Sequence, residues 1–300
     1  MSSVEYSSFG PFGGKLSSLG RFPGYFRLVD AAASLLCRFG SKERAVLLWP
    51  DASFRVDLRD RIQRRMWCGS YEVHVTRCLK AILGQGDVFV DVGANIGYHS
   101  FFAAGMVGKH GKVFSFEPDP GAYVRLESNL NGFPQAHTLN YAVWDREGKL
   151  TFERSSVAQE SGWGTITVVR SPGAGEQVTV RATSLDGWKR DSGTAFIRAI
   201  KVDAEGSELG ILRGAKRVLS ECRPCLLLEV NDVLLRQAKT SGDEVLNELR
   251  RHSYQIYEIA AGKLLRIPAF IDFSFADCVC LPEESAGQLL RLLERHGFRL

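Results

Sequence analysis

The sequence lacks any apolar run long enough to span a membrane, since no stretch of about 18 consecutive apolar residues occurs in its 300 residues. Its N-terminus, Met-Ser-Ser-Val-Glu-Tyr-Ser-Ser-Phe-Gly, also lacks the basic segment followed by an apolar segment that marks a leader peptide. We therefore expect a cytoplasmic protein without a membrane span.

An excess of charge of one sign is missing as well. The chain has 38 basic and 34 acidic residues, a net charge of +4, which is too small for whole-chain attraction to nucleic acid. We expect no nucleic-acid partner. The hydrophobic fraction of 45% and the charged fraction of 24% are typical of a globular protein with a large core.

A complete set of metal-binding cysteines is absent too. The seven cysteines are an odd number, and the pair in Cys222-Arg-Pro-Cys225 has no second pair or nearby histidine to complete a zinc site. Most of the cysteines lie in apolar segments, where cysteine behaves as a small hydrophobic residue. We therefore expect reduced thiols and assign no metal ligands.

What the sequence does contain is one stretch typical of a cofactor site, Asp87-Val-Phe-Val-Asp-Val-Gly-Ala-Asn-Ile-Gly-Tyr98. Its first six residues are mostly apolar and favour a strand, and a glycine-bearing turn then leads into a helical pattern. A strand, a tight turn and a helix N-terminus form the usual binding place for a small-molecule cofactor in an α/β sheet.

Strands and helices alternate around this stretch, which predicts a parallel sheet with right-handed crossovers. The other strands of this pattern are expected at 112–117, 136–143, 195–202 and 224–230, with closing strands at 254–259 and 273–281.

The same patterns divide the chain into segments. Residues 1–23 are rich in serine and glycine and are expected to be flexible, and 24–70 are expected to form a helix and a β-hairpin as a small appendage. The main domain would cover 71–300. Within it, 148–182 reads as short antiparallel strands inserted into the sheet or extending it.

The composition of the turn narrows the choice of cofactor. A dinucleotide site needs glycine at the third and sixth positions of Gly93-Ala-Asn-Ile-Gly-Tyr98, where this chain has Asn95 and Tyr98. No phosphate-binding GxxxxGK[ST] loop occurs either. Glu117 ends the next strand, where a carboxylate can accept both hydroxyls of a ribose. An adenosyl ligand without phosphates fits this combination.

Six motifs make the pattern more specific, and they are Gly69-Ser-Tyr-Glu72, Asp91-Val-Gly-Ala-Asn-Ile-Gly97, Phe116-Glu-Pro118, Asn140-Tyr-Ala-Val143, Ile200-Lys-Val-Asp-Ala-Glu-Gly-Ser-Glu208 and Leu226-Leu-Leu-Glu-Val230. In order and spacing they resemble the FkbM family of S-adenosylmethionine-dependent methyltransferases, over about residues 67–260. The resemblance implies a class I methyltransferase fold, an α/β Rossmann-like sheet of seven mostly parallel strands with helices on both faces and the last strand antiparallel.

The resemblance also implies roles for residues of the central turn. Asp91 and the turn through Gly93, Asn95 and Gly97 would hold the methionine end of S-adenosylmethionine, and Glu117 would bind its ribose. The alternative for the glycines is that they only close a tight turn between strand and helix.

Four further residues are assigned to the cofactor site by the same resemblance. Pro118 belongs to the motif of the ribose-binding acid, and Ala142 would border the adenine, unless it only packs within its strand. Tyr71 and Glu72 would form a lid over the cofactor. The alternative for this pair is an ordinary helix N-terminus, where an acidic residue is favoured anyway.

The acids after the fourth strand are the candidates for chemistry. Asp203, Glu205 and Glu208 follow Val202 at the rim of the sheet where ligands lie. We assign Asp203 and Glu205 to the reaction centre, where one could act as general base. The alternative is that Glu208 caps a helix and that Glu205 is a surface residue.

A divalent cation held by Asp203, Asn231 and Asp232 is a further alternative, because oxygen ligands suit Mg²⁺. The family resemblance implies O-methylation of a hydroxyl on a sugar, a glycan or a specialised metabolite. A non-catalytic adenosyl-binding or interaction module on the same fold is the alternative, and a dinucleotide oxidoreductase is disfavoured by Asn95 and Tyr98.

Overall fold

A computed structural model describes residues 25–39, 43–49, 52–154, 165–166, 175–268 and 274–300. The predicted flexible segment 1–23 lies outside the described residues. The described residues form two compact units, one that ends at Val73 and one that begins at His74. No helix within the described residues combines the length and the apolar character that a bilayer crossing requires.

The first unit contains a helix, an antiparallel hairpin and a second helix, which are α2 (Tyr25–Phe39), β1 (Glu43–Trp49), β2 (Ala52–Asp57) and α3 (Arg61–Trp67). Asp60 begins α3, because its carboxylate accepts the backbone N–H of Gln63 at 2.9 Å. Arg64 on α3 forms an ion pair with Asp30 on α2 at 3.0 Å. These contacts fix the fold of the unit and involve none of the motifs noted above.

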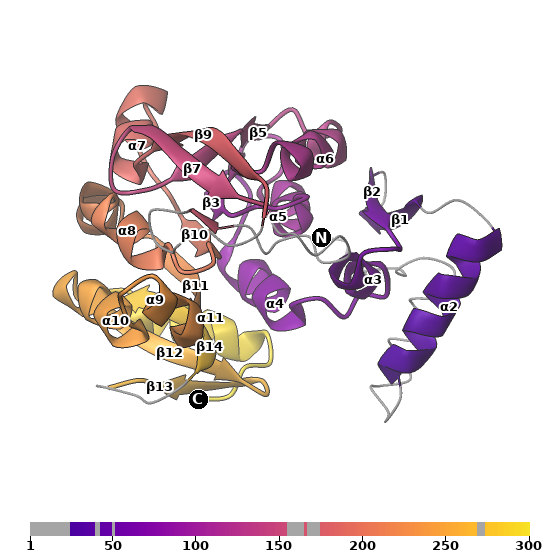
Figure 1. The fold of residues 1–300 in the computed structure, drawn as a ribbon. Coiled ribbons are helices and arrows are strands. Elements are labelled where there is room, and N and C mark those ends of the chain that lie inside the picture. The colour runs from indigo at the N-terminus through magenta and orange to yellow at the C-terminus, as the bar shows by residue number, and fades with distance from the viewer. Residues whose placement is uncertain (1–24, 40–42, 50–51, 155–164, 167–174, 269–273) are drawn as a thin grey trace. The chain divides into compact units, whose positions relative to one another are not determined.

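The second unit is built on an eight-stranded sheet with the order β13-β12-β14-β11-β10-β3-β4-β5 (Figure 1). Strands β5, β4, β3, β10 and β11 are parallel, and β14 runs antiparallel between β11 and β12. The strands are β3 (Val88–Val92), β4 (Lys112–Phe116), β5 (Ala136–Leu139), β10 (Ala199–Val202), β11 (Cys225–Asn231), β12 (Tyr254–Ala260), β13 (Lys263–Arg266) and β14 (Phe275–Pro282).

The predicted α/β class is therefore confirmed, with one strand more than the seven expected. The additional strand is β13, which pairs with β12 through a tight turn at Ala261 and Gly262, both with positive φ. Only Leu264 of this strand is buried. The strand therefore lacks the repeated alternation of buried and exposed residues by which a strand is predicted from a sequence.

Helices cover both faces of this sheet. One core contains residues of α7 (Leu185–Ser192), α8 (Glu208–Arg213), α9 (Asp232–Gln237) and α10 (Gly242–Arg251). The other contains residues of α4 (Val73–Ile82), α5 (Tyr98–Val107) and α11 (Ala286–Arg295). Because both faces are buried, the central strands are almost continuously apolar, as in β10, where all four residues are buried.

The predicted insertion forms a sheet of its own. Strands β7 (Gly148–Glu153), β8 (Thr165–Ile166) and β9 (Gln177–Thr183) join β6 (Tyr141–Val143) in the order β6-β9-β7-β8. The described strands of the insertion therefore add none to the main sheet. Residues 155–164 and 167–174 of the predicted insertion lie outside the described part.

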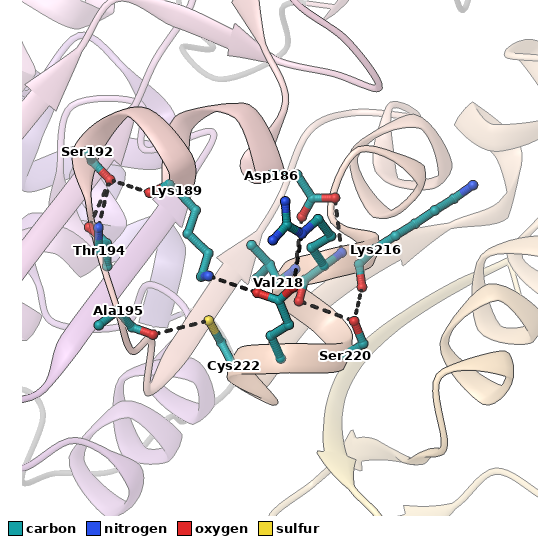
Figure 2. Close-up of polar contacts among 11 residues, drawn as sticks. Asp186, Lys189, Ser192, Thr194, Ala195, Lys216, Val218, Ser220 and Cys222 are labelled. Carbon is teal, nitrogen blue, oxygen red and sulfur yellow. Dashed lines mark hydrogen bonds and ion pairs between the residues drawn. The ribbon is translucent and has the colours of Figure 1, made fainter.

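A polar cluster fastens α7 to the short π-helical segment η1 (Val218–Cys222) (Figure 2). The carboxylate of Asp186 accepts the backbone N–H of Val218 at 2.9 Å, and Lys189 forms an ion pair with Glu221 at 3.1 Å. The thiol of Cys222 donates to the carbonyl of Ala195 at 3.7 Å. Cys222 therefore has a structural role, and Cys225, the second cysteine of the CxxC pair, is buried in the sheet.

Candidate active site

The predicted turn between β3 and α5 has three residues in the left-handed region, Gly93 at φ 77°, Asn95 at φ 51° and Gly97 at φ 89°. Asparagine tolerates this conformation better than most side chains, which explains its place between two glycines. The backbone N–H groups of Gly93 and Ala94 both donate to the carbonyl of Phe116, at 3.0 and 2.9 Å. The turn is therefore fastened to the end of the neighbouring strand β4.

The two glycines are required by the packing of the protein itself. A Cβ atom at Gly93 would overlap the backbone carbonyl oxygen of Asp203, and one at Gly97 would lie 2.7 Å from Cδ1 of Leu126. These neighbours explain the glycines without any ligand. The glycines alone therefore do not indicate a cofactor, and the polar side chains around the turn are the groups that would hold one.

Glu117 is the residue that joins the turn to the end of β4. Its carboxylate is 6% exposed and accepts backbone N–H groups from Asn95 at 2.7 Å and from Asp119 at 2.8 Å. Each of its oxygens accepts one of these bonds, so each retains a lone pair for a hydroxyl donor. Burial raises the pKa of Glu117 to about 8, and the two backbone hydrogen bonds partly offset this shift.

Asn140 was not predicted as a site residue, yet it binds the main chain of the motif that was predicted to hold the ribose. Its side-chain amide donates to the carbonyls of Glu117 at 2.8 Å and Pro118 at 3.1 Å. The chain leaves the main sheet at this residue, so the single strand predicted for 136–143 is wrong and is split into β5 and β6. Pro118 itself is half-buried in the same turn.

Asp91 supplies a buried carboxylate next to the turn. It is 1% exposed, and its Oδ2 accepts the hydroxyl of Ser100 at 2.6 Å. Its Oδ1 is buried and has no hydrogen-bond partner among the described residues. A buried carboxylate oxygen left unpaired is costly, so a site for a cationic donor fits here. The α-ammonium of S-adenosylmethionine is such a donor.

A second group of polar residues lies at the carboxyl end of β10 and on β11. The ammonium of Lys201, a buried residue, lies 2.9 Å from Oδ2 of Asp203, and the side chain of Asp203 is 20% exposed. Glu229 on the adjacent strand β11 has a carboxylate oxygen within 4.8 Å of that of Asp203. The arrangement places a charged lysine and two acids together at the carboxyl ends of two parallel strands, where ligands of such sheets bind.

The other two acids after β10, Glu205 and Glu208, have different surroundings. Glu205 is half-buried and has a φ of 49°, a strained conformation for a residue other than glycine. Glu208 is 3% exposed, and its Oε1 accepts the backbone N–H groups of Ala204 and Gly206, each at 3.2 Å. Burial raises the pKa of Glu208 to about 7. Glu208 therefore closes the turn that carries Asp203 and Glu205.

Three further residues were predicted to bind the cofactor. Ala142 is 1% exposed within the hydrophobic cluster of the second sheet, so it packs as a strand residue, and its contact with adenine stays a prediction. Tyr71 and Glu72 belong to the first compact unit, directly before α4. Their role as a lid also stays a prediction.

The alternative set of cation ligands is largely occupied by other contacts. Asn231 begins α9 by accepting the backbone N–H of Leu234 at 3.3 Å, and Asp232 accepts the backbone N–H of Gly242 at 2.7 Å. Asp232 also pairs with Arg236. Both residues are therefore explained by helix capping, as expected for polar residues at a helix start.

Residues 91–256 match the model of the methyltransferase FkbM domain. The hexuronic acid methyltransferase AglP of Haloferax volcanii is 32% identical over 149 residues, which are 49% of this chain and 58% of that protein. The 2-O-methyltransferase NoeI of Sinorhizobium fredii is 26% identical over 166 residues, which are 51% of this chain and 67% of that protein. The chain thus spans less than two thirds of the length of AglP.

Solved structures resemble the chain more distantly. The fibrillarin of Aeropyrum pernix with bound S-adenosyl-L-methionine is 11% identical, with a TM-score of 0.40, over 70% of this chain and 74% of that chain. A likeness of this degree does not place a ligand in this chain.

Proposed function

Because the chain belongs to the FkbM family of methyltransferases, whose cofactor is S-adenosyl-L-methionine, we propose that it methylates a hydroxyl group of a sugar, a glycan or a specialised metabolite. The names of two relatives support this acceptor class, since AglP is a hexuronic acid methyltransferase and NoeI a 2-O-methyltransferase. The acceptor is a small molecule or a glycan, and no nucleic acid is involved in this proposal.

The observation that carries the proposal is the hydrogen bond of 2.7 Å from the backbone of Asn95 to the carboxylate of Glu117. It brings the turn after β3 and the acid after β4 together around one place. There Glu117 can accept the ribose hydroxyls, and Oδ1 of Asp91 can accept from the ammonium of the methionine end.

The bound cofactor supplies an activated methyl group on a sulfonium, so little covalent chemistry is asked of the protein. The chain has to orient the acceptor hydroxyl, exclude water and accept the hydroxyl proton. We assign the proton to the carboxylate of Asp203, which Lys201 holds in place at 2.9 Å. Glu205, on the strained turn two residues later, would contact the acceptor.

Two measurements test the proposal. Calorimetry should show binding of S-adenosylhomocysteine to the wild-type chain and loss of binding in Glu117→Ala. Labelled methyl groups from S-adenosylmethionine should reach an acceptor in a host extract, and Asp203→Asn should abolish this transfer while cofactor binding persists. Asp191→Asn is the matched control, because Asp191 is exposed on α7 and forms a surface ion pair with Arg190. Cofactor binding without any transfer would instead support the non-catalytic module.

A cytoplasmic location is part of the same proposal. All seven cysteines lie among the described residues, and all are free thiols. Reduced thiols are typical of the cytosol.

A further inference from the structure

A row of three polar residues crosses the centre of the main sheet. Ser115 on β4, Asp91 on β3 and Lys201 on β10 are direct neighbours in the strand register. Two positions earlier, the same strands carry Val113, Phe89 and Ala199, which belong to the core packed by α4, α5 and α11. Since side chains two positions apart share a face, the polar row continues an apolar face towards the site.

Two hydroxyl groups connect this row to α5. Ser115 donates to Oγ of Ser100 at 2.7 Å, and Ser100 donates to Oδ2 of Asp91 at 2.6 Å. Both serines are 0% exposed. The hydrogen bonds therefore run in one direction, from β4 through α5 to the carboxylate.

Packing alone does not explain these hydroxyls. The residues that follow Ser100 on α5 are Phe101, Phe102, Ala103 and Ala104, all buried and apolar. A buried hydroxyl is costly unless it is hydrogen-bonded, and an alanine would fit an apolar helix at lower cost. The two serines hydrogen-bond to each other and to Asp91 Oδ2, but Asp91 Oδ1 has no hydrogen-bond partner within the part of the chain that the structure describes. The network thus ends in one open acceptor.

We propose that Ser100 and Ser115 are positioning residues, which hold Oδ2 of Asp91 so that Oδ1 is presented to the ammonium of the cofactor's methionine end. This inference rests on the proposed function. The hydroxyl of Ser100 fixes the carboxylate orientation, and Ser115 fixes the hydroxyl of Ser100. A carboxylate held in this way loses little rotational freedom when the ammonium binds, which strengthens binding.

The test compares two ligands that differ in the group concerned. S-adenosylhomocysteine carries the α-ammonium, whereas 5′-methylthioadenosine has the same adenosine and a thioether but no amino-acid portion. Ser100→Ala should weaken binding of S-adenosylhomocysteine about tenfold, the effect of one hydrogen bond to a charged group. Binding of 5′-methylthioadenosine should change by less than about twofold, because that ligand does not contact Asp91.

Ser115→Ala should act in the same direction but less, since it removes only the second bond of the network. This variant leaves the bond between Ser100 and Asp91 intact, so it also serves if Ser100→Ala fails to fold. Ser192→Ala, at an exposed serine of α7, is the control and should change neither affinity.

The results separate this inference from the function on which it rests. Equal weakening of both ligands, or no weakening of either, would overturn the positioning role. If the wild-type chain bound neither ligand, the proposed function would fail, and the inference with it.

Discussion

The α-carbon of Gly93 lies so close to the backbone carbonyl of Asp203 that a methyl group added at Gly93 would overlap that oxygen. The backbone N–H of Asp203 in turn donates to the carbonyl of Val92 at 3.1 Å. The turn proposed to bind the cofactor and the turn proposed to carry the general base are therefore in direct contact, and neither can shift alone.

Gly93→Ala should destabilise the protein by about 3 kcal/mol or more, because the new side chain meets a backbone atom and the residue has a φ of 77°. Urea denaturation measures the effect. Gly132→Ala is the control, since among the described residues a Cβ there would meet no atom within 4 Å beyond its chain neighbours, and it should change stability by less than about 0.5 kcal/mol. A stable Gly93→Ala variant would contradict the described contact.

Cofactor affinity should rise with pH. The pKa of Glu117 is about 8 in the ligand-free protein, so the carboxyl group is mostly protonated at neutral pH. Ribose hydroxyls that donate to the anion lower this pKa in the complex, and binding then releases a proton. The affinity for S-adenosylhomocysteine should increase between pH 6 and 8, by up to about tenfold for each pKa unit of lowering, and then level off.

Calorimetry in buffers of different ionisation enthalpy would count the released proton. Glu117→Gln should abolish both the release and the pH dependence. An affinity that falls between pH 6 and 8 would contradict the assignment of the ribose to the ionised carboxylate.

Glu208→Gln should stabilise the protein at alkaline pH. Since the pKa of Glu208 is raised to about 7 by burial, the folded state keeps the proton longer than the unfolded state does. The free energy of unfolding of the wild-type protein therefore decreases by the contribution of Glu208 as pH rises from about 4.5 through 7, because the unfolded chain binds fewer protons there. The gain from the substitution should be near zero at pH 5 and at most about 3 kcal/mol at pH 8.5.

Thermal melts of both proteins over this pH range measure the difference. Glu284→Gln is a suitable control, because Glu284 is exposed and its pKa is lowered by Arg223. A constant difference between wild type and Glu208→Gln at all pH values would contradict the prediction.

Arg154, directly after β7, pairs with Asp119 beside Glu117, and its loss should weaken cofactor binding. Its guanidinium pairs with Asp119 at 3.0 Å, and the backbone of Asp119 donates to Glu117. Arg154 is partly exposed, so Arg154→Ala should weaken binding of S-adenosylhomocysteine by only about two- to fivefold. Arg146→Ala, at an arginine that is 75% exposed, is the control. Equal affinities of wild type and Arg154→Ala for S-adenosylhomocysteine would show that the ion pair of Arg154 with Asp119 does not help to position Glu117.

The sequence predicted those parts of the fold and the site that follow from local pattern and parallel topology. The strand before Gly93 and the acids Glu117 and Asp203 follow directly from apolar runs that end at the same edge of the sheet. Because the carboxyl ends of parallel strands meet at one edge, the sequence brings these residues together without knowledge of distances.

The parts that the sequence did not reveal depend on contacts between distant segments. In the sequence, Ser100 is one more residue of an apolar helix and Ser115 is an ordinary strand residue. Their hydrogen bonds, which lead to Asp91, are visible only in the structure. Asn140 breaks a strand because its amide reaches backbone carbonyls more than 20 residues away, a contact that no local pattern encodes. The assignment of Gly93 to the cofactor site stays a prediction, and the sequence did not reveal that the carbonyl of Asp203 beside it also requires a glycine.

The attachment at Asn140 is insensitive to substitutions in the motif that it binds. Its amide binds main-chain carbonyls, which every residue possesses, so this attachment does not depend on the side chains of its partners. Strands β7, β8 and β9 form their own sheet and hydrophobic cluster beyond that point. Substitutions at Glu117 or Pro118 therefore change a side chain but leave this attachment in place, so the strands that follow Asn140 stay connected to β4 in such variants.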